Sequence, residues 1–270
     1  MNIISFPGLG INLTINPAAF HIGSKPIYWY ALIILTGFIL GFLFIFRDCE
    51  KRGVKRDNVW DIALYTLFFG IIGARLYYVL FSLDEFDHFS DVFKIWNGGL
   101  AIYGGIIAGT LTALIYCKVK KLPILNTFDV CVPALFIGQA AGRFGNFVNA
   151  EVYGGITNLP WGMEINGFGP VHPLFIYESL WNILGLVILL ILRDKKTSDG
   201  QVFCFYVFWY SLGRLFLEGM RDPMYILYLI PNLLGISQAV ALAAMIFAIV
   251  LFIYVTKHKK LKNVNENTIA

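Results

Sequence analysis

The chain has 270 residues, of which 58% are hydrophobic and 14% are charged, and it carries a net charge of +4. Its mean hydropathy is +0.69, and a typical soluble domain is only about 45–50% apolar with about 25% charged residues. Too little polar surface remains to cover a core in water, and four cysteines are too few for a disulfide scaffold. The composition also excludes a disordered chain and predicts an all-α polytopic membrane protein.

Seven apolar stretches are each long enough to cross a bilayer, whose core of roughly 30 Å needs about 20 apolar residues per helix. In chain order they cover residues 27–46, 59–81, 98–117, 127–148, 173–192, 202–219 and 233–256. Only one basic residue, Lys25, precedes the first stretch, which is too long for the apolar part of a signal peptide, so we expect it to stay in the mature protein. The sequence therefore predicts one integral membrane domain over residues 1–270 with seven transmembrane helices.

The basic residues predict how these helices are oriented. Fifteen of the 21 Lys and Arg residues lie in three alternate connections and the C-terminal tail, at 47–56, 118–121, 193–196 and 257–262. The opposite connections hold only Lys25, Lys94 and Arg221. By the positive-inside rule, the N-terminus lies outside and the C-terminus lies in the cytoplasm. The 149–172 connection then lies outside the membrane, where its composition suits a small extracytoplasmic cap or a mobile lid. Nothing in the sequence supports nucleic-acid binding.

Three arginines, Arg75, Arg143 and Arg214, lie inside predicted helices. A charge at mid-bilayer costs at least about 2.5 kcal/mol on insertion scales, so such a residue is expected to face a cavity or a partner. In the predicted orientation all three lie in the outer half of the membrane. For Arg75 the alternative is a side chain that reaches the outer headgroups. For the other two arginines, neighbouring polar residues favour a functional site.

Polar residues gather around Arg143 and Arg214. Tyr210, Arg214 and Glu218 follow an i, i+4, i+8 spacing, which places them on one face of a helix. The alternative interpretation is that Arg214 and Glu218 form an ion pair within the helix that only neutralises their charges and has no functional role. Residues 142–155 read GRFGNFVNAEVYGG, so a charge, amides and an acid alternate with glycines that allow close approach of a backbone or ligand.

Two further segments are predicted to lie near the outer face of the membrane, at the same depth as these polar residues. Residues 96–105 read WNGGLAIYGG, which is too rich in glycine for a regular helix and predicts a re-entrant or cavity-lining segment. Glu178 adds an acid near the start of the fifth stretch, and His172 is read as an interfacial or capping residue. The sequence contains no phosphate-binding loop, no metal-binding pattern and no serine-hydrolase motif. We therefore expect no metal and no cofactor.

An outer-leaflet cavity with two guanidinium groups suits an anion that cannot leave the membrane, and a phospholipid phosphate fits that description. Arginine binds phosphate oxygens in a bidentate manner and stays charged when desolvated. The residues thus predict a phosphate site, without specifying a reaction.

The 142–154 segment resembles the signature of the bacterial prolipoprotein diacylglyceryl transferases, G-R-x-G-N-F-x-N-x-E-x-x-G. Further positions of the chain match the family pattern and occur in the same order as in the family. They are Trp29-Tyr30, 73–76 and 98–105 before the segment, and His172-Pro173 with Tyr177-Glu178 and 210–221 after it. The resemblance implies transfer of the diacylglyceryl group from phosphatidylglycerol to the lipobox cysteine of a prolipoprotein signal peptide. A thioether forms and glycerol phosphate is released, at a site that faces the outer leaflet of the bacterial cell membrane.

The resemblance implies functional positions at Tyr30, Arg143, Asn146, Glu151, Gly154, Tyr210, Arg214 and Glu218. We interpret Arg143 and Arg214 as the phosphate clamp, with Asn146 at the same headgroup, Glu218 orienting Arg214, and Arg75 as a further substrate-binding residue. The clamp would stabilise the charge that grows on the leaving phosphate.

Two positions depart from the family pattern. Tyr103 stands where well-known members carry a histidine, and Leu174-Phe175 replaces a polar pair. The substrate thiol, whose pKa is near 8.5, must lose its proton to attack. The proton acceptor stays open among Tyr103, Glu151 and a phosphate oxygen of the lipid.

Two other classes of membrane protein compete with this interpretation. Buried arginines and interrupted helices also occur in anion transporters, although here the charges cluster toward one face and the two halves show no repeat. A seven-helix receptor is the third class, but the connections are short and the polar cluster faces outward.

Overall fold

The computed structural model describes residues 1–86, 88–231 and 233–268, and it is mostly helical. The helices are α1 (Trp29–Asp48), α2 (Arg56–Phe81), α3 (Ile102–Val119), α4 (Ile124–Asn149), α5 (Leu174–Leu192), α6 (Gln201–Glu218) and α7 (Ile236–Thr268). Most boundaries lie within a few residues of the predicted stretches. The third helix starts later than predicted because Gly98 and Gly99 have φ angles of 91° and 77°, which a regular helix does not contain.

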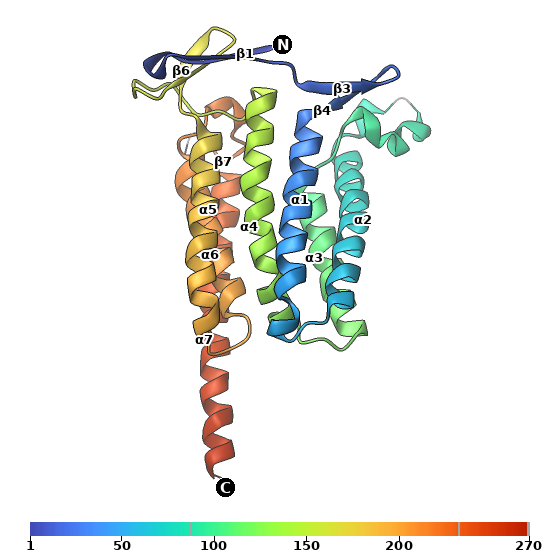
Figure 1. The fold of residues 1–270 in the computed structure, drawn as a ribbon, viewed down its shortest axis with the longest axis vertical. Helices are drawn as coiled ribbons and strands as arrows, with labels where there is room; N and C mark the ends of the chain where they lie inside the picture. The colour runs from blue at the N-terminus through green and yellow to red at the C-terminus, as the bar shows by residue number, and fades with distance from the viewer. Residues whose placement is uncertain (87, 232, 269–270) are drawn as a thin grey trace. The chain divides into compact units, whose positions relative to one another are not determined.

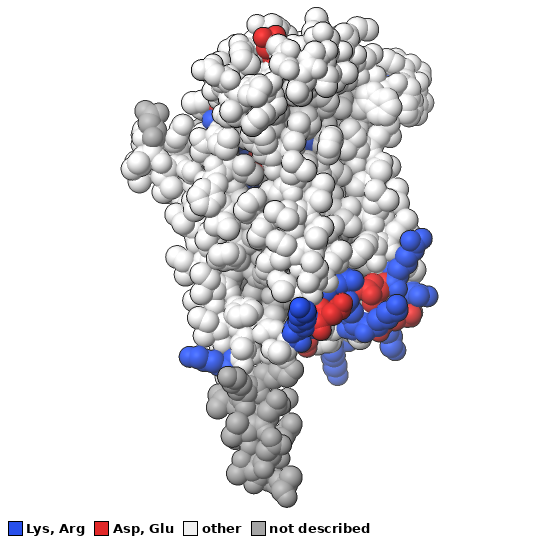
Figure 2. Space-filling view, turned by 60° about the vertical axis from the view of Figure 1, so that its left-hand side comes forward, with Lys and Arg blue, Asp and Glu red and all other residues white. Residues whose placement is uncertain are grey.

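Six described helices are long and apolar enough to cross a membrane: α1, α2, α3, α4, α5 and the Ile236–His258 part of α7. The remaining predicted stretch forms α6, in which Gln201, Arg214 and Glu218 lower the hydropathy. Many large apolar side chains on these helices are exposed, for example Phe68, Ile115 and Ile246 at 60–63%. Figure 2 shows that most of the surface on this face carries no charged side chain. Both observations confirm a polytopic membrane protein.

The chain separates into two compact units, one formed by Met1–Phe44 with Cys131–Ala270 and the other by Ile45–Val130. In the smaller unit, α2 packs along α3. Gly73 permits this close packing, because a Cβ at that position would lie 2.8 Å from the carbonyl oxygen of Gly104. In the larger unit, Gly37 and Gly41 lie against Ala141 and Ala134 of α4, so small residues allow these two helices to pack closely.

The structure also contains short antiparallel strands. The all-α prediction did not include them. A four-stranded sheet in the larger unit has the order β2-β1-β5-β6 and contains Ile11–Ile15, Asn2–Phe6, Met163–Ile165 and Phe168–Val171. Its buried side chains Ile4, Met163 and Val171 form a cluster with Phe175 at the start of α5. The sheet thereby ties the 149–172 connection to the N-terminal strands. β6 leads directly into α5 (Figure 1).

Two hairpins complete the strands of the larger unit. One joins β3 (Ala18–Ile22) to β4 (Lys25–Tyr28) just before α1, and the other joins β7 (Tyr228–Ile230) to β8 (Leu234–Gly235) just before α7.

A pair of tryptophans fixes the register between α5 and α6. Trp181 and Trp209 each donate an indole hydrogen bond of 3.0 Å to the other's backbone carbonyl, and their rings stack at 4.5 Å. Gly213 of α6 leaves room for the Trp181 ring, and Gly185 of α5 does the same for Trp209. The tryptophan pair holds α5 and α6 side by side. Polar residues that lie one to two turns from it on the two helices are therefore close to each other. Those residues, Glu178 on α5 and Arg214 on α6, belong to the site described next.

Candidate active site

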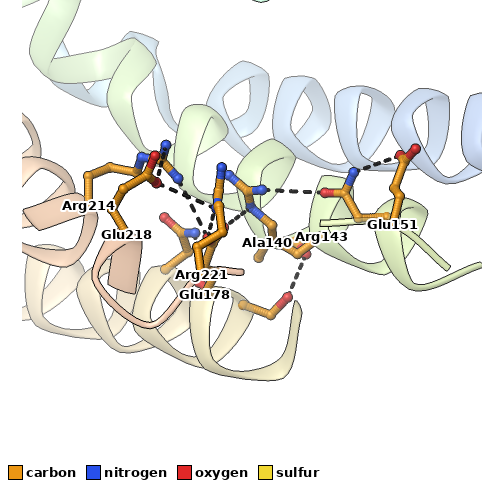
Figure 3. Close-up of polar contacts among 10 residues, drawn as sticks. Ala140, Arg143, Glu151, Glu178, Arg214, Glu218 and Arg221 are labelled. Atoms are coloured by element: carbon orange, nitrogen blue, oxygen red, sulfur yellow. Dashed lines mark hydrogen bonds and ion pairs between the residues drawn. The ribbon is translucent and has the colours of Figure 1, made fainter. Parts of the chain in front are cut away.

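One buried acid, Glu178 on α5, contacts three arginines from other elements (Figure 3). Its Oε2 atom pairs with Nε of Arg143 on α4. Its Oε1 atom lies 3.1 Å from Nη2 of Arg221, which follows α6, and 3.6 Å from Nη1 of Arg214 on α6. Only 4% of Glu178 is exposed. A single carboxylate thus joins three segments that are far apart in the sequence.

A second buried acid, Glu218, completes the group. Its Oε2 atom lies 2.7 Å from Nη2 of Arg214 and 3.5 Å from Nε of Arg221, and the residue is 2% exposed. We call the five residues Arg143, Glu178, Arg214, Glu218 and Arg221 the arginine cluster. Buried charges are tolerated only when they are paired, and the cluster pairs them with one positive charge in excess. The predicted Arg214–Glu218 pair therefore exists, but it does not simply neutralise itself.

An amide connects the arginine cluster to a third acid. Nη1 of Arg143 donates a 3.3 Å hydrogen bond to Oδ1 of Asn146, and Nδ2 of Asn146 donates a 2.9 Å hydrogen bond to Oε1 of Glu151. Nδ2 of Asn149 donates to the same carboxylate oxygen at 3.4 Å. Three residues predicted from the signature therefore form one continuous chain of hydrogen bonds, with Glu151 at its end.

The backbone around Glu151 is strained. Ala150 and Val152, on either side of it, both have a φ of 56°. This left-handed conformation is a genuine outlier for a β-branched residue such as valine, and strain of this kind clusters at functional sites. The chain leaves α4 here in a turn in which the amide of Glu151 donates to the carbonyl of Asn146. The strained turn points the Glu151 carboxylate back toward that helix end.

Gly154 places the Arg221 backbone. The two residues form an isolated antiparallel β-bridge, and neighbouring hydrogen bonds run from Gly154 to His172 and from Gly155 to Met220. A Cβ at Gly154 would lie 2.5 Å from Cβ of His172 and 2.8 Å from the carbonyl oxygen of Met220. Only glycine fits this crossing without displacing the segment that carries Arg221.

Two predicted tyrosines lie next to the arginines. The ring of Tyr30, in the first turn of α1, packs against Gly145, where an added Cβ would lie 2.6 Å from a ring carbon. Tyr210 precedes Arg214 by one helical turn and stacks on Tyr206 with ring centroids 6.1 Å apart. Tyr210 therefore lies on the α6 face that carries Arg214, and Tyr30 packs against α4 two residues beyond Arg143.

A small cavity lies beside Glu151. Its wall combines the polar groups of Asn146, Glu151 and Tyr153 with apolar residues that include Phe147 and Phe175. The rings of Phe147 and Phe175 stack at 4.2 Å. The family departure at Leu174-Phe175 therefore supplies apolar packing here, with exposures of 1% and 8%.

Arg75, in the smaller unit, hydrogen-bonds to the backbone. Its guanidinium donates to the carbonyl oxygens of Asp91, Val92, Gly98 and Gly99 at 2.7–2.9 Å, and the residue is 8% exposed. These contacts favour an anchoring role for Arg75, which holds the 91–99 segment together, and they do not match a side chain reaching for the headgroups. Binding of substrate by Arg75 stays a prediction.

Tyr103 also belongs to the smaller unit, in the first turn of α3, and is 41% exposed. The amide of Ala101, just before α3, donates a 3.0 Å hydrogen bond to the carbonyl of Ala74 on α2, which fixes where the helix begins. The arginine cluster lies in the larger unit. A role for Tyr103 as proton acceptor stays a prediction.

The family model for prolipoprotein diacylglyceryl transferase matches residues 17–254. The chain belongs to this family. Its relatives include proteins named phosphatidylglycerol–prolipoprotein diacylglyceryl transferase, and the one from Lysinibacillus sphaericus is 40% identical over 256 residues, which cover 90% of this chain and 93% of the relative. The relative from Clostridioides difficile is 38% identical over 249 residues, covering 92% and 98%. The one from Streptococcus pyogenes is 39% identical over 262 residues, covering 93% and 98%. The resemblance indicated by the signature is confirmed over most of the chain.

Two residues of this diacylglyceryl transferase, Glu178 and Arg221, match the family pattern in the sequence, but the pattern predicts no role for either of them. Two signals pointed to them: Glu178 is an acid inside an apolar stretch, and Arg221 follows Glu218 by three residues, which is one further helical turn. The structure places both at the centre of the arginine cluster.

Proposed function

We propose that this protein transfers the diacylglyceryl group of phosphatidylglycerol to the cysteine thiol in the lipobox of a prolipoprotein, as the first step of lipoprotein maturation. Family membership supports the reaction type. The observation that carries the proposal is the arginine cluster, which gathers three guanidinium groups around buried acids beside the family signature. A buried, positively charged site of this kind suits the phosphate of an anionic lipid.

The reaction exchanges one bond for another. The thiolate sulfur attacks the glycerol carbon that bears the phosphate ester, so a C–S bond forms while the C–O bond to that carbon breaks. The electron pair of the broken bond stays on the phosphate oxygen, and glycerol phosphate leaves. The phosphate changes from a monoanionic diester to a monoester with more negative charge. Groups that meet this growing charge stabilise the transition state more than the bound substrate.

Arg143 and Arg214 act as the clamp on the phosphate. Each guanidinium offers paired N–H donors in a plane and keeps its charge when desolvated. Asn146, bonded to Arg143, supports the same headgroup, and Glu218 holds Arg214 in place at 2.7 Å. Tyr30 and Tyr210 shape the walls next to these arginines. No metal or cofactor takes part in this scheme.

Glu151 accepts the thiol proton. A carboxylate is a common general base in proteins, and that of Glu151 belongs to the same hydrogen-bonded chain as Arg143. The two asparagine amides hold the Glu151 carboxylate, and the cavity beside it leaves space next to the carboxyl group. The strained turn at Ala150 and Val152 fixes its direction.

The protein forms one integral membrane domain with seven crossings, including α6. Its neighbours α5 and α7 shelter the polar face of α6, which satisfies the requirement that charged groups in a membrane face protein. Basic residues at 118–121 and 193–196 lie at the ends of α4 and α5 that are opposite to Arg143 and Glu178. With the basic ends in the cytoplasm, the N-terminus is outside. The active site then faces the outer leaflet of the cell membrane, and the β-sheet forms a cap.

Reconstitution tests the proposal. The purified protein is placed in liposomes of phosphatidylglycerol with a lipobox peptide, without nucleotide and with a chelator of divalent metals. Mass spectrometry should detect the peptide with a diacylglyceryl thioether and an equal amount of glycerol phosphate. A peptide with serine in place of the cysteine is the control and should stay unmodified. Folded protein that forms no thioether, or that carries anions across sealed liposomes without lipid turnover, contradicts the proposal.

A further inference from the structure

We infer that Gln139 on α4 and Tyr206 on α6 form a subsite for an acyl ester carbonyl of the lipid, deeper in the membrane than the phosphate clamp. The inference deepens the proposed function and rests on it, because it takes the lipid phosphate to lie at Arg143 and Arg214. It predicts that the protein distinguishes a diacyl lipid from a dialkyl ether lipid with the same headgroup.

The helices α4 and α6 are connected at two depths in the proposed orientation. At the outer depth, Arg143 and Arg214 both contact Glu178. At the inner depth, Nε2 of Gln139 donates a 2.8 Å hydrogen bond to the hydroxyl of Tyr206. Gln139 precedes Arg143 by four residues, which is about 6 Å along a helix, and lies on the same helix face. The polar surface that begins at the arginine cluster thus continues toward the middle of the membrane.

The face of α4 follows the chemical order of a phospholipid. At steps of four residues it carries a guanidinium at Arg143, an amide at Gln139 and an apolar side chain at Leu135, which is 47% exposed. A phospholipid likewise carries its phosphate, then its ester carbonyls, then its acyl chains. With the phosphate at Arg143, an ester carbonyl lies near Gln139, and an acyl chain continues past Leu135 into the bilayer.

Aromatic contacts hold the Tyr206 ring in place. The ring of Phe136, which is fully buried, meets it edge to face with centroids 4.9 Å apart, and the Tyr210 ring stacks on it at 6.1 Å. Tyr206 also precedes Tyr210 by four residues, so both hydroxyl groups belong to the α6 face that carries Arg214. The fixed phenol oxygen in turn orients the amide of Gln139.

Gln139 and Tyr206 do not satisfy each other completely. Oε1 of Gln139 is buried and has no hydrogen-bond partner among the described residues. Within the same part of the chain, the second N–H of the amide and the O–H of the phenol are also left as donors. Unpaired polar groups that are shielded from water cost free energy, and polar residues within a membrane mark functional positions.

An ester carbonyl completes the pair. It offers only acceptors, so an amide N–H of Gln139 donates to it. When the amide turns, Tyr206 donates its O–H to Oε1 of Gln139, and each polar group then has a partner. An ether linkage has no carbonyl and leaves the amide unsatisfied. The pair therefore recognises the ester without taking part in the reaction, because the bond that breaks is at the glycerol carbon that bears the phosphate.

The experiment compares phosphatidylglycerol with its dialkyl ether analogue of equal chain length. The analogue keeps the bond that breaks, so the comparison reports recognition and not chemistry. For wild-type protein, KM should be about fivefold lower for the diacyl lipid, which is the effect of roughly one hydrogen bond. Gln139→Met has nearly the same shape but no amide. It should raise KM for the diacyl lipid about fivefold and leave KM for the ether lipid unchanged.

Two tyrosine variants complete the set. Tyr206→Phe keeps the ring contacts and removes the hydroxyl that orients the amide, so it should reduce the preference for the diacyl lipid, although less than Gln139→Met does. Tyr65→Phe is the matched control, because Tyr65 lies on α2 in the smaller unit and is 46% exposed. It should keep the wild-type preference. A merely structural defect would weaken the binding of both lipids alike and leave their ratio unchanged.

Equal affinity of the wild type for the two lipids overturns the inference, as does an unchanged ratio in folded Gln139→Met. If Gln139→Met does not fold, the wild type and Tyr206→Phe still decide the question. Competitive binding in nanodiscs measures the same ratio without turnover. A diacyl preference in binding with no thioether from either lipid would contradict the proposed function alone. Thioether from both lipids at equal KM would contradict this inference alone.

Discussion

Gly154 and Arg221 face each other in an antiparallel β-bridge, so the last glycine of the family signature holds the backbone of an arginine in the active site. The signature therefore acts at two levels. Its polar residues Arg143, Asn146 and Glu151 form the hydrogen-bonded chain, and its glycine brings a separate segment to that chain. A glycine in a catalytic signature thus has a positional role that its own chemistry does not reveal.

Gly154→Ala tests this positional role. The added Cβ would overlap His172 and Met220, so we expect the Arg221 segment to move and turnover to fall at least about tenfold, with a loss of about 1–3 kcal/mol in unfolding free energy. Gly155→Ala is the matched control, because nothing lies within 4 Å of a Cβ at that position. Equal activity of the two variants would show that the crossing tolerates a side chain.

The role of Glu151 as proton acceptor predicts a specific pH dependence. Glu151→Gln should lower turnover about 100-fold at pH 7. Its residual rate should then rise about tenfold per pH unit toward the thiol pKa near 8.5, because only spontaneously ionised thiol can react. Wild-type turnover should depend less steeply on pH. Initial rates of thioether formation between pH 6 and 9 provide the measurement.

Tyr103→Phe separates two of the three candidate proton acceptors, Tyr103 and Glu151. If Glu151 takes the proton, removal of the phenol oxygen should leave turnover close to the wild-type value. A loss as large as that of Glu151→Gln, with normal lipid binding, would instead assign the step to Tyr103.

Replacing Arg75 should lower the stability of the protein without lowering its affinity for the lipid. Its guanidinium donates to four carbonyl oxygens while only 8% exposed, so Arg75→Ala should lower the unfolding free energy by about 3 kcal/mol. Arg75→Lys should rescue little, because an ammonium has only three donors. Unfolding in detergent and KM for phosphatidylglycerol are measured together. A raised KM at wild-type stability would mean that Arg75 binds substrate.

His172 should make the protein less stable in acid. Burial lowers the pKa of its imidazole below the ordinary value near 6.5, so the unfolded chain binds a proton more readily than the folded protein. Stability from this group is complete above about pH 6.5 and is lost as the pH falls toward the lower folded value. The unfolding temperature should drop between pH 7 and 5 in the wild type, and less so in His172→Gln. The exposed His21, changed to Gln, should behave like the wild type.

The helices were predictable because a membrane imposes a length and a composition on each of them. The apolar stretch at 27–46 became α1 (Trp29–Asp48) for that reason. The strands were not predictable. β1 pairs with β5 across more than half of the chain, and each has too few residues to show a clear alternation of polar and apolar side chains.

The candidate site divides in the same way. Arg143, Asn146 and Glu151 are close in sequence, so one motif reveals them. Glu178 and Arg221 come from separate segments and meet where the Trp181–Trp209 pair joins α5 to α6 and Gly154 pairs with the backbone of Arg221. The sequence also treats all arginines in apolar stretches alike. It cannot show that the partners of Arg75 are backbone carbonyls while those of Arg143 are an acid and an amide.

The most direct test of the phosphate clamp compares Arg143→Lys with Arg143→Ala in single-turnover formation of the thioether at saturating phosphatidylglycerol. Lysine keeps the charge but loses the paired N–H donors. We expect Arg143→Ala to slow the chemical step about 100-fold or more, as for loss of a donor to a developing oxyanion, and Arg143→Lys to fall between Arg143→Ala and the wild type. Near-normal rates in both folded variants would contradict the clamp and, with it, the account of the site.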